Sequence, residues 1–293
     1  MKVIDRISDQ ALSLSFEIFP PKTDATFEGV LIAASAIARL QPSYISVTYG
    51  AGGAGSRYTV QVARALQCGS STETLAHLTC VGADRQGIRD YLDTLRESGI
   101  TNIMALRGDL PEGMDPQAME DSPFPHASDL IREIRASGDF CIGAACYPEV
   151  HPESANQAED IRSLREKVEA GADFLTTQMF FDNNVLYNFL YKLREAGITV
   201  PVVPGIMPIT AASQVIRAQK LSGSFMPRRF TSLVDRFGTS PEAMKQAGIL
   251  YAADQIIDLF ANGIRHVHVY TMNKPDVAAA IQSHLSQMLG RTF

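Results

Sequence analysis

Polar side chains with catalytic chemistry recur beside short apolar runs in this chain. One of them, Glu17, lies inside such a run, Ser15-Phe16-Glu17-Ile18-Phe19. In a strand, Phe16 and Ile18 take one face and Glu17 takes the other. If that second face lines a protein interior, the carboxyl group is partly desolvated, which favours its protonated form. A carboxylic acid that keeps its proton near neutral pH can act as a general acid.

Further apolar runs are followed by short segments, most of which contain polar side chains. These segments are Thr48-Tyr49-Gly50, His77-Leu78-Thr79, Arg107-Gly108-Asp109, Tyr147-Pro148-Glu149-Val150-His151-Pro152, Gln178, Pro204-Gly205-Ile206-Met207-Pro208 and Tyr270-Thr271-Met272-Asn273-Lys274. Each residue alone has an ordinary explanation, such as an ion-paired carboxylate for Glu17, a core histidine for His77 or a turn residue for Asp109. As a set they indicate a site where the ends of these runs meet.

The apolar runs are short and β-branched and alternate with helix patterns, so they predict strands separated by helices. The eight predicted strands are Leu12 to Phe19, Tyr44 to Thr48, Thr74 to Thr79, Asn102 to Leu106, Phe140 to Cys146, Phe174 to Gln178, Val200 to Ile206 and Arg265 to Tyr270. Predicted helices include Phe27 to Leu40, Arg57 to Leu66, Gln86 to Glu97, Ala127 to Arg135, Asn156 to Ala170, Asn184 to Glu195 and Ser213 to Lys220. Strict alternation implies a parallel sheet, and eight units favour closure into a barrel.

The fold class predicted is therefore α/β, a single (β/α)8 TIM barrel that takes residues 1–293 as one catalytic domain. The spacing between the seventh and eighth strands is too long for one helix. We expect extra helices within Met226 to Phe260, the later one starting near Pro241. Functional side chains of such barrels come from the C-terminal ends of the strands and the loops after them. The polar segments are thus expected to share one rim.

Composition narrows the classes of partner. The net charge of −6 argues against nucleic acid and anionic membranes, and it leaves a small molecule as the expected partner. Cys68, Cys80, Cys141 and Cys146 form no CxxC pair, and no secretion signal is evident, which predicts a cytoplasmic location. The uncharged stretch from Ala196 to Ile216 contains three prolines, so it does not read as a transmembrane helix.

Two motifs suggest other chemistries. Gly50 to Gly55 satisfies GxGxxG between a strand and a helix. It follows the second strand, and the next strand ends without a ribose-binding acid, so a Rossmann interpretation is disfavoured. His266 and His268 would share one strand face, as in metal-dependent barrel hydrolases. Because no matching ligands are evident at the other strand ends, packing is favoured, no metal is expected, and a hydrolase is kept as an alternative.

Taken in order, these segments resemble the methylenetetrahydrofolate reductase family in its short bacterial form, with the catalytic barrel only. The matching blocks are Phe16-Glu17-Ile18-Phe19-Pro20-Pro21, Ser46-Val47-Thr48-Tyr49-Gly50-Ala51, His77-Leu78-Thr79-Cys80, Ala105-Leu106-Arg107-Gly108-Asp109-Leu110-Pro111, Tyr147-Pro148-Glu149-Val150-His151-Pro152-Glu153, Thr177-Gln178, Pro204-Gly205-Ile206-Met207-Pro208 and Tyr270-Thr271-Met272-Asn273. The resemblance implies a barrel flavoprotein that holds FAD and takes a hydride from NADH or NADPH. In a ping-pong cycle it would interconvert 5,10-methylenetetrahydrofolate and 5-methyltetrahydrofolate. Relatives often form homo-oligomers.

The resemblance also implies roles for individual residues. Glu17 matches the general acid that helps to open the folate's five-membered ring, and Asp109 matches the aspartate between flavin and pterin. The implied substrate contacts are Thr48, Asp109, Gln178, Gln214 and Lys274. The implied cofactor contacts are Tyr49, Ala51, His77, Arg107, Gly108, Asp109, Ala127, Tyr147, His151, Asp160 and Lys167. Arg107 and Lys167 suit the flavin's diphosphate.

Three positions depart from the family pattern. Ser163 and Glu166 stand where bacterial relatives commonly place Asn and a basic residue against the nucleotide end of the flavin. A carboxylate near a diphosphate weakens that contact. Ala218 stands where an aromatic ring often stacks on the reduced dinucleotide. These departures keep a second alternative open, a catalytically impaired flavin- or folate-binding protein.

Overall fold

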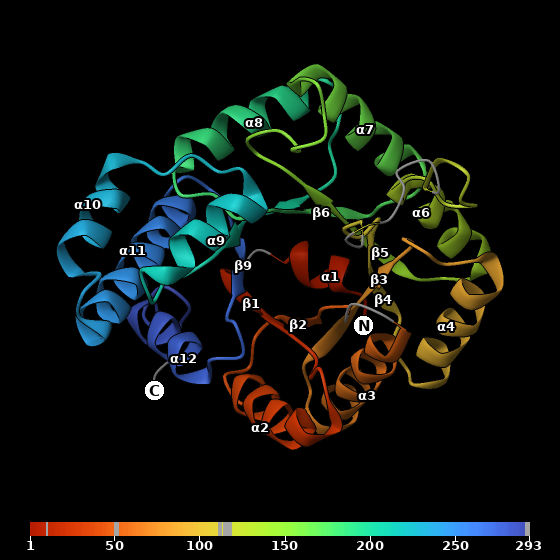
Figure 1. Cartoon of the computed structure of the whole chain (residues 1–293), viewed down its shortest axis with the longest axis horizontal. Coiled ribbons are helices and arrows are strands. Elements are labelled where there is room, and N and C mark those ends of the chain that lie inside the picture. The colour runs from red at the N-terminus through yellow and green to blue at the C-terminus, as the bar shows by residue number, and fades with distance from the viewer. Residues whose placement is uncertain (10, 50–52, 111–112, 114–118, 291–293) are drawn as a thin grey trace.

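The computed structural model of the protein describes residues 1–9, 11–49, 53–110, 113 and 119–290. Within these residues, nine parallel strands form a nearly closed barrel, seen end-on in Figure 1 with the helices around it. The strands are β1 (Ser13–Ile18), β2 (Tyr44–Val47), β3 (Glu73–Thr79), β4 (Asn102–Leu106), β5 (Cys141–Cys146), β6 (Phe174–Thr177), β7 (Val202–Val203), β8 (Gly205–Ile206) and β9 (His266–Tyr270). They follow the order β7-β6-β5-β4-β3-β2-β1-β9-β8. The predicted α/β TIM-barrel class is confirmed.

Helices follow the strands in the alternation that the sequence predicts. They are α1 (Val3–Ile7), the short 3-10 turn η1 (Asp24–Thr26), α2 (Phe27–Ala38), α3 (Gly53–Gly69), α4 (Arg85–Glu97), α6 (Ala127–Ser137), α7 (Gln157–Glu169), α8 (Asn183–Glu195), α9 (Ser213–Ser222), α10 (Arg228–Phe237), α11 (Pro241–Ala261) and α12 (Pro275–His284). Several begin at a capping side chain, as at Asp84, Asn156 and Asp182, whose oxygen atoms accept backbone N–H bonds. No helix among the described residues is both long and apolar enough to cross a membrane.

The predicted seventh strand is divided in two at Pro204. A proline has no N–H to donate, so the ladder is interrupted there. The Pro204 carbonyl still accepts a hydrogen bond from the His268 N–H at 2.8 Å. Residues before Pro204 form β7, which pairs with β6, and those after it form β8, which pairs with β9. One stretch of chain therefore joins the two ends of the sheet, and all eight predicted barrel positions are occupied.

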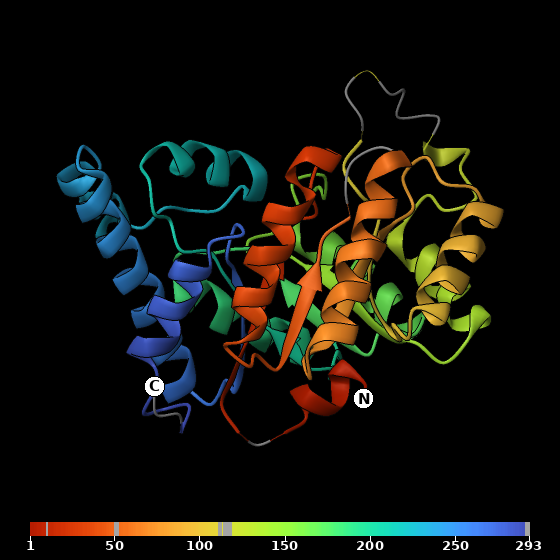
Figure 2. The ribbon, with the colours of Figure 1, turned by 90° about the horizontal axis from the view of Figure 1, so that it is seen from below.

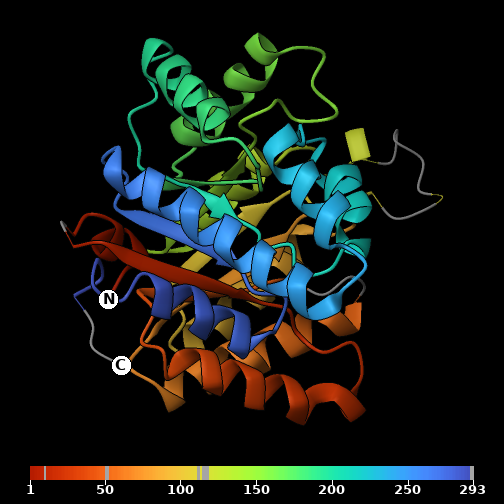
Figure 3. The same cartoon turned by 90° about the vertical axis from the view of Figure 1, so that its left-hand side faces the viewer.

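The stretch between β8 and β9 holds the extra helices that its length predicts. α10 and α11 lie there, and α11 begins at Pro241 with Ser240 as its N-cap. Gly248 allows α11 to cross the loop after β8, because a Cβ at this position would overlap the carbonyl oxygen of Ile209. Figure 3 shows α11 lying across the outside of the barrel beside α12.

One short helix, α1, was not predicted. It lies at the end of the barrel where the strands begin, below the strands in Figure 2. Val3 and Ile7 are buried there against Tyr44 and Leu75, and the Val3 N–H donates to Oδ1 of Asn102 at 2.8 Å. Five residues are too few to show a helical period. The helix closes the end of the barrel opposite the polar strand ends.

Candidate active site

A cavity of about 1650 Å³ opens at the carboxyl ends of the strands. Of the sequence-predicted site residues, it is lined by Glu17, Thr48, Tyr49, His77, Arg107, Gly108, Asp109, Ala127, Tyr147, His151, Asp160, Lys167, Gln178 and Gln214. Lys274 is not part of the lining, and Ala51 lies outside the described residues. The fold therefore brings together side chains that are up to about two hundred residues apart in the chain.

Glu17 lies on the floor of this cavity and is 7% exposed. Its Oε2 lies 3.6 Å from Nε2 of His77 and 3.8 Å from Nε2 of His268, and it accepts a hydrogen bond from Oγ of Ser46 at 3.4 Å. Strand register places Glu17 beside Ser46 of β2 and Tyr270 of β9. Sheet pairing, rather than a loop, thus holds the carboxyl group in the interior.

The two histidines beside Glu17 have different surroundings. Burial lowers the pKa of His77 to about 4, an effect larger than the opposing attraction of the Glu17 charge. His268 shares hydrogen bonds through Nδ1 with Oγ of Ser15 at 2.8 Å and through Nε2 with Oγ of Ser46 at 3.1 Å. At pH 7 His77 is neutral, so it does not offset the desolvation of Glu17 with a positive charge.

The first histidine of the His-Val-His motif, His266, is also used within the fold. Nδ1 of His266 lies 2.6 Å from Oγ of Ser13, and its Nε2 lies 3.0 Å from the carbonyl oxygen of Asp9. In the part of the chain that the structure describes, no three His, Cys, Asp or Glu side chains gather in a way that suits a metal ion. Hydrogen bonding along β1 accounts for both imidazoles.

A tight turn after β4 places Arg107 and Asp109 in the cavity lining. Gly108 at its centre has φ +92°, and a Cβ there would lie 2.7 Å from Cγ1 of Val81. Both the backbone conformation and the space require glycine at this position. Asp109 itself is exposed to the cavity and makes no hydrogen bond or ion pair with the other described residues.

The loop after β5 carries a strained residue. Val150 has φ +83°, a conformation that is an outlier for a β-branched side chain. On either side of it, the rings of Tyr147 and His151 meet edge-on with their centroids 4.5 Å apart. Such strain persists where surrounding structure enforces it, and it is enriched at functional sites.

Arg107 is already paired in this structure. Its Nη1 and Nη2 donate to the two carboxylate oxygens of Glu153 at 2.5 and 2.6 Å. This pairing is the main reason that the pKa of Arg107 is raised and that of Glu153 lowered. Glu153 was not predicted as a site residue, although it ends the motif that begins at Tyr147. An anion that binds Arg107 must share it with this carboxylate.

Lys167 and Asp160 lie about two turns apart on α7 and both contribute to the lining. Nζ of Lys167 donates to the carbonyl oxygen of Ala145 at 2.9 Å, and Oδ2 of Asp160 accepts the N–H of His151 at 3.3 Å. Burial lowers the pKa of Lys167 and raises that of Asp160. Ser163 and Glu166, the two departures on this helix, also line the cavity.

The predicted folate-side contacts meet at the start of α9. Oε1 of Gln214 accepts hydrogen bonds from the N–H and Oγ1 of Thr210 at 2.9 and 3.2 Å, and from the N–H of Ala211 at 3.0 Å. Nζ of Lys274 donates to the same Thr210 hydroxyl at 2.9 Å. Gln214 and Lys274 are therefore connected through Thr210, although only Gln214 lines the cavity.

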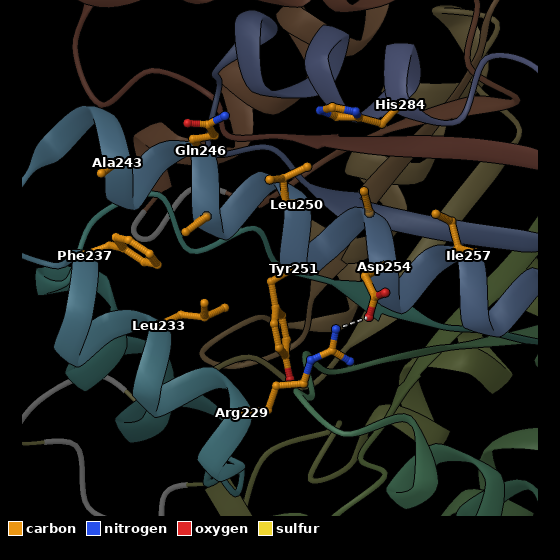
Figure 4. Close-up of a pocket in the computed structure, with 12 residues that line it drawn as sticks. Arg229, Leu233, Phe237, Ala243, Gln246, Leu250, Tyr251, Asp254, Ile257 and His284 are labelled. Carbon is orange, nitrogen blue, oxygen red and sulfur yellow. Dashed lines mark ion pairs between the residues drawn. The ribbon is translucent and has the colours of Figure 1, made fainter.

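A second, smaller cavity of about 600 Å³ lies on the outside of the barrel, between α10, α11 and α12. Figure 4 shows Leu233, Phe237 and Leu250 around it, with the ion pair between Arg229 and Asp254 at one side, 2.9 Å apart. None of the sequence-predicted site residues lines it.

Solved structures with a similar fold carry unrelated descriptions. An uncharacterized protein from Clostridium thermocellum that binds two copies of 5-methyl-5,6,7,8-tetrahydrofolic acid has a TM-score of 0.65 and 13% identity, covering 98% of this chain and 97% of that one. A 2,3-dimethylmalate lyase has a TM-score of 0.52 and 11% identity, covering 98% and 85%. At such identities the likeness supports the fold alone.

Relatives found by sequence say more about the family of this chain than the shared fold does. "Methylenetetrahydrofolate reductase (NADH) 1" of Zea mays is 35% identical over 97% of this chain and 51% of its own length. The chain thus spans about half the length of the plant relatives that it matches. "5,10-methylenetetrahydrofolate reductase" of Pectobacterium carotovorum subsp. carotovorum is 34% identical, and that of Escherichia coli (strain K12) is 32% identical, each over 92% of this chain and 89% of the relative. A family model for methylenetetrahydrofolate reductase matches residues 2–286. The chain therefore belongs to the methylenetetrahydrofolate reductase family.

Proposed function

We propose that the chain reduces 5,10-methylenetetrahydrofolate to 5-methyltetrahydrofolate with electrons that FAD receives from NADH or NADPH. The observation that carries this proposal is the presence of Glu17, Asp109 and Gln178 in one cavity with the described residues expected to contact the flavin. Membership of the reductase family supports the reaction class. The two substrates would use the cavity in turn, in a ping-pong cycle.

The cavity fits a flavin dinucleotide in size and in chemistry. Its volume of about 1650 Å³ exceeds the roughly 300–1,000 Å³ of a pocket for one drug-sized ligand, so it has room for a cofactor and a substrate together. Arg107 and Lys167 would hold the diphosphate, with Tyr147 and His151 alongside. When bound, FAD would supply the acceptance and return of a hydride, which no protein side chain provides.

Glu17 would act as the general acid. It would donate its proton to the nitrogen that leaves when the folate's five-membered ring opens to the iminium cation. The structure supports this role because the carboxyl group is buried and its neighbour His77 is neutral at pH 7. Ser46 donates to Oε2 of Glu17 and would keep the carboxyl group in place.

Asp109 and Gln178 would act on the substrate after the ring opens. The Asp109 carboxylate faces the cavity and makes no hydrogen bond or ion pair with the other described side chains, so its negative charge is available to stabilise the cation. Gln178 accepts the N–H of Met179 through Oε1 at 2.9 Å. That bond and a side-chain hydrogen bond with Tyr147 hold the amide in place, and the remaining N–H of its NH₂ group would bind a ring acceptor on the pterin or the nicotinamide.

The proposal is tested by loading the purified protein with FAD and recording its absorption spectrum without oxygen. We expect a yellow protein whose oxidised-flavin bands are bleached by 5-methyltetrahydrofolate and, separately, by NADH or NADPH. Failure to take up FAD at any concentration, or flavin that neither folate nor dinucleotide reduces, would contradict it.

One alternative keeps the same site without the turnover. Glu166, Ser163 and Ala218 line the cavity, and the first two would lie at the nucleotide end of the flavin, with the small side chain of Ala218 where a dinucleotide would bind. These residues favour a protein that binds flavin or folate but turns over slowly. Tight folate binding with no flavin reduction by either donor would decide for it.

Action as one domain, assembly into homo-oligomers and a cytoplasmic location stay predictions. The four free cysteines agree with a reducing compartment.

A further inference from the structure

Three segments at the mouth of the cavity carry positive charge only. They are residues 19–23 after β1, residues 207–222 between β8 and the end of α9, and residues 271–274 after β9. Together they contain Lys22, Arg217, Lys220 and Lys274 and no Asp or Glu, although the whole chain has a net charge of −6. The fold thus concentrates positive charge on one side of the mouth.

Hydrogen bonds connect these segments. The N–H of Phe19 donates to Oδ1 of Asn273 at 2.8 Å, and Nδ2 of Asn273 donates to the carbonyl oxygen of Phe19 at 2.9 Å. Lys274 reaches Thr210 in the loop before α9. In Figure 2, α9 and the first turn of α2 stand on the same upper side of the barrel. The segments therefore form one continuous side of the opening.

Two of the four cations are free to meet a ligand. Lys22 and Arg217 are exposed and line the cavity, and neither makes a hydrogen bond or an ion pair with another described residue. Lys274 is engaged by Thr210, and Lys220 does not line the cavity. Arg217 follows Gln214 by three residues on α9, so the two side chains share one face of the helix.

We propose that Lys22 and Arg217 bind the distal anionic end of a substrate whose reacting end lies beside Glu17. This inference rests on the proposed function, under which both substrates carry oxyanions away from the reacting ring: carboxylates on the glutamyl tail of a folate, or the diphosphate of the nicotinamide dinucleotide and the additional ribose phosphate of NADPH. The guanidinium fork of Arg217 suits either group. Its position one turn beyond Gln214 favours the carboxylates of a γ-linked glutamyl tail that extends outward from the pterin.

The test compares Lys22→Gln and Arg217→Gln with Lys220→Gln, a matched loss of charge on α9 outside the lining. Apparent dissociation constants are taken from the way the rate of anaerobic flavin reduction depends on ligand concentration in FAD-loaded protein. The ligands are 5-methyltetrahydrofolate with one and with three glutamates, NADH and NADPH. We expect each lining variant to weaken binding of the triglutamate about three- to fivefold at low salt, and less at high salt. Lys220→Gln should change it less than about twofold.

The ligand that responds identifies the source of the anion. Weakening confined to the triglutamate assigns Lys22 and Arg217 to the glutamyl tail, and weakening confined to NADPH or to both dinucleotides assigns them to phosphate. If no ligand responds more in the lining variants than in Lys220→Gln, the inference is overturned while the proposed function stands. A wild-type protein that binds neither folate nor dinucleotide would overturn both.

Discussion

The floor of the large cavity and its α7 wall hold their charged groups in different ways. On the floor, Glu17 is surrounded by Ser46, His77 and His268, all carried by strands. Register between neighbouring strands sets these positions, and the groups are buried. The floor is therefore arranged before any ligand binds.

The wall formed by Arg107, the loop after β5 and α7, here called the α7 wall, instead places acidic side chains beside its basic ones. Arg107 is held by Glu153, and Lys167 lies near the buried Asp160. Glu166 adds a further exposed carboxylate to the lining. An incoming diphosphate must compete with these acids, whereas a pterin that reaches the floor meets groups already in place. Under the proposed function, the floor would carry the chemistry and the wall would set the affinity for the cofactor.

The largest expected effect is on the floor. Glu17→Gln removes the proton donor while keeping the shape of the side chain, so folate turnover should fall by about 10²- to 10⁴-fold. Reduction of the flavin by NADH needs no acid from this position and should be retained. Stopped-flow measurement of the two half-reactions separates these effects, with Glu169→Gln, an exposed position of α7 outside the cavity lining, as a control. Unchanged folate turnover in Glu17→Gln would remove this residue from the acid role.

The next effect concerns His77 and the stability of the floor. The pKa of His77 is about 4 in the folded protein and near 6.5 in the unfolded chain. At pH values between these two, the unfolded chain therefore binds more protons than the folded protein. Stability is therefore lost as pH falls from about 6.5 towards 4, with up to about 3 kcal/mol due to this one residue. Urea unfolding of flavin-free protein at pH 7.5 and pH 5 measures this loss.

Replacing His77 separates its contribution to the pH dependence of stability from the contributions of the other histidines. The pKa values of His151 and His266 are also lowered by burial and contribute a loss of the same sign. His77→Gln should therefore be less sensitive to acid than the wild type, rather than insensitive. Equal slopes of stability against pH in the two proteins would show that His77 is not buried in its neutral form.

The smallest expected effect is on the wall. Glu166→Gln removes one exposed carboxylate near the expected diphosphate and should tighten FAD binding about threefold at low salt, with less change at high salt. Glu169→Gln removes the same charge from the same helix outside the lining and should leave the affinity unchanged. Equal FAD affinities for Glu166→Gln and wild type, from fluorescence titrations, would mean that this acid does not face the cofactor.

Much of the architecture was predictable because its causes are local. Alternating apolar runs and helix patterns located all eight barrel positions, and Pro241 marked the start of α11. The site could be placed at the strand ends because parallel strands share one carboxyl edge. The division of the seventh strand was not predicted, although Pro204 is its cause. The helix α1 was missed because its stability comes from packing against Tyr44 and Leu75, far away in the chain.

The sequence thus predicted which side chains lie at the strand ends, but not which of them are neighbours in space. The sequence was sufficient to place Glu17 on the strand face opposite Phe16 and Ile18, because alternation along a strand is a local property. That Ser46, His77 and His268 meet it depends on register between strands, which is a long-range property. For the same reason the Arg107–Glu153 pair and the one-sided charge around Lys22 and Arg217 became visible only when the loops were brought together at the mouth.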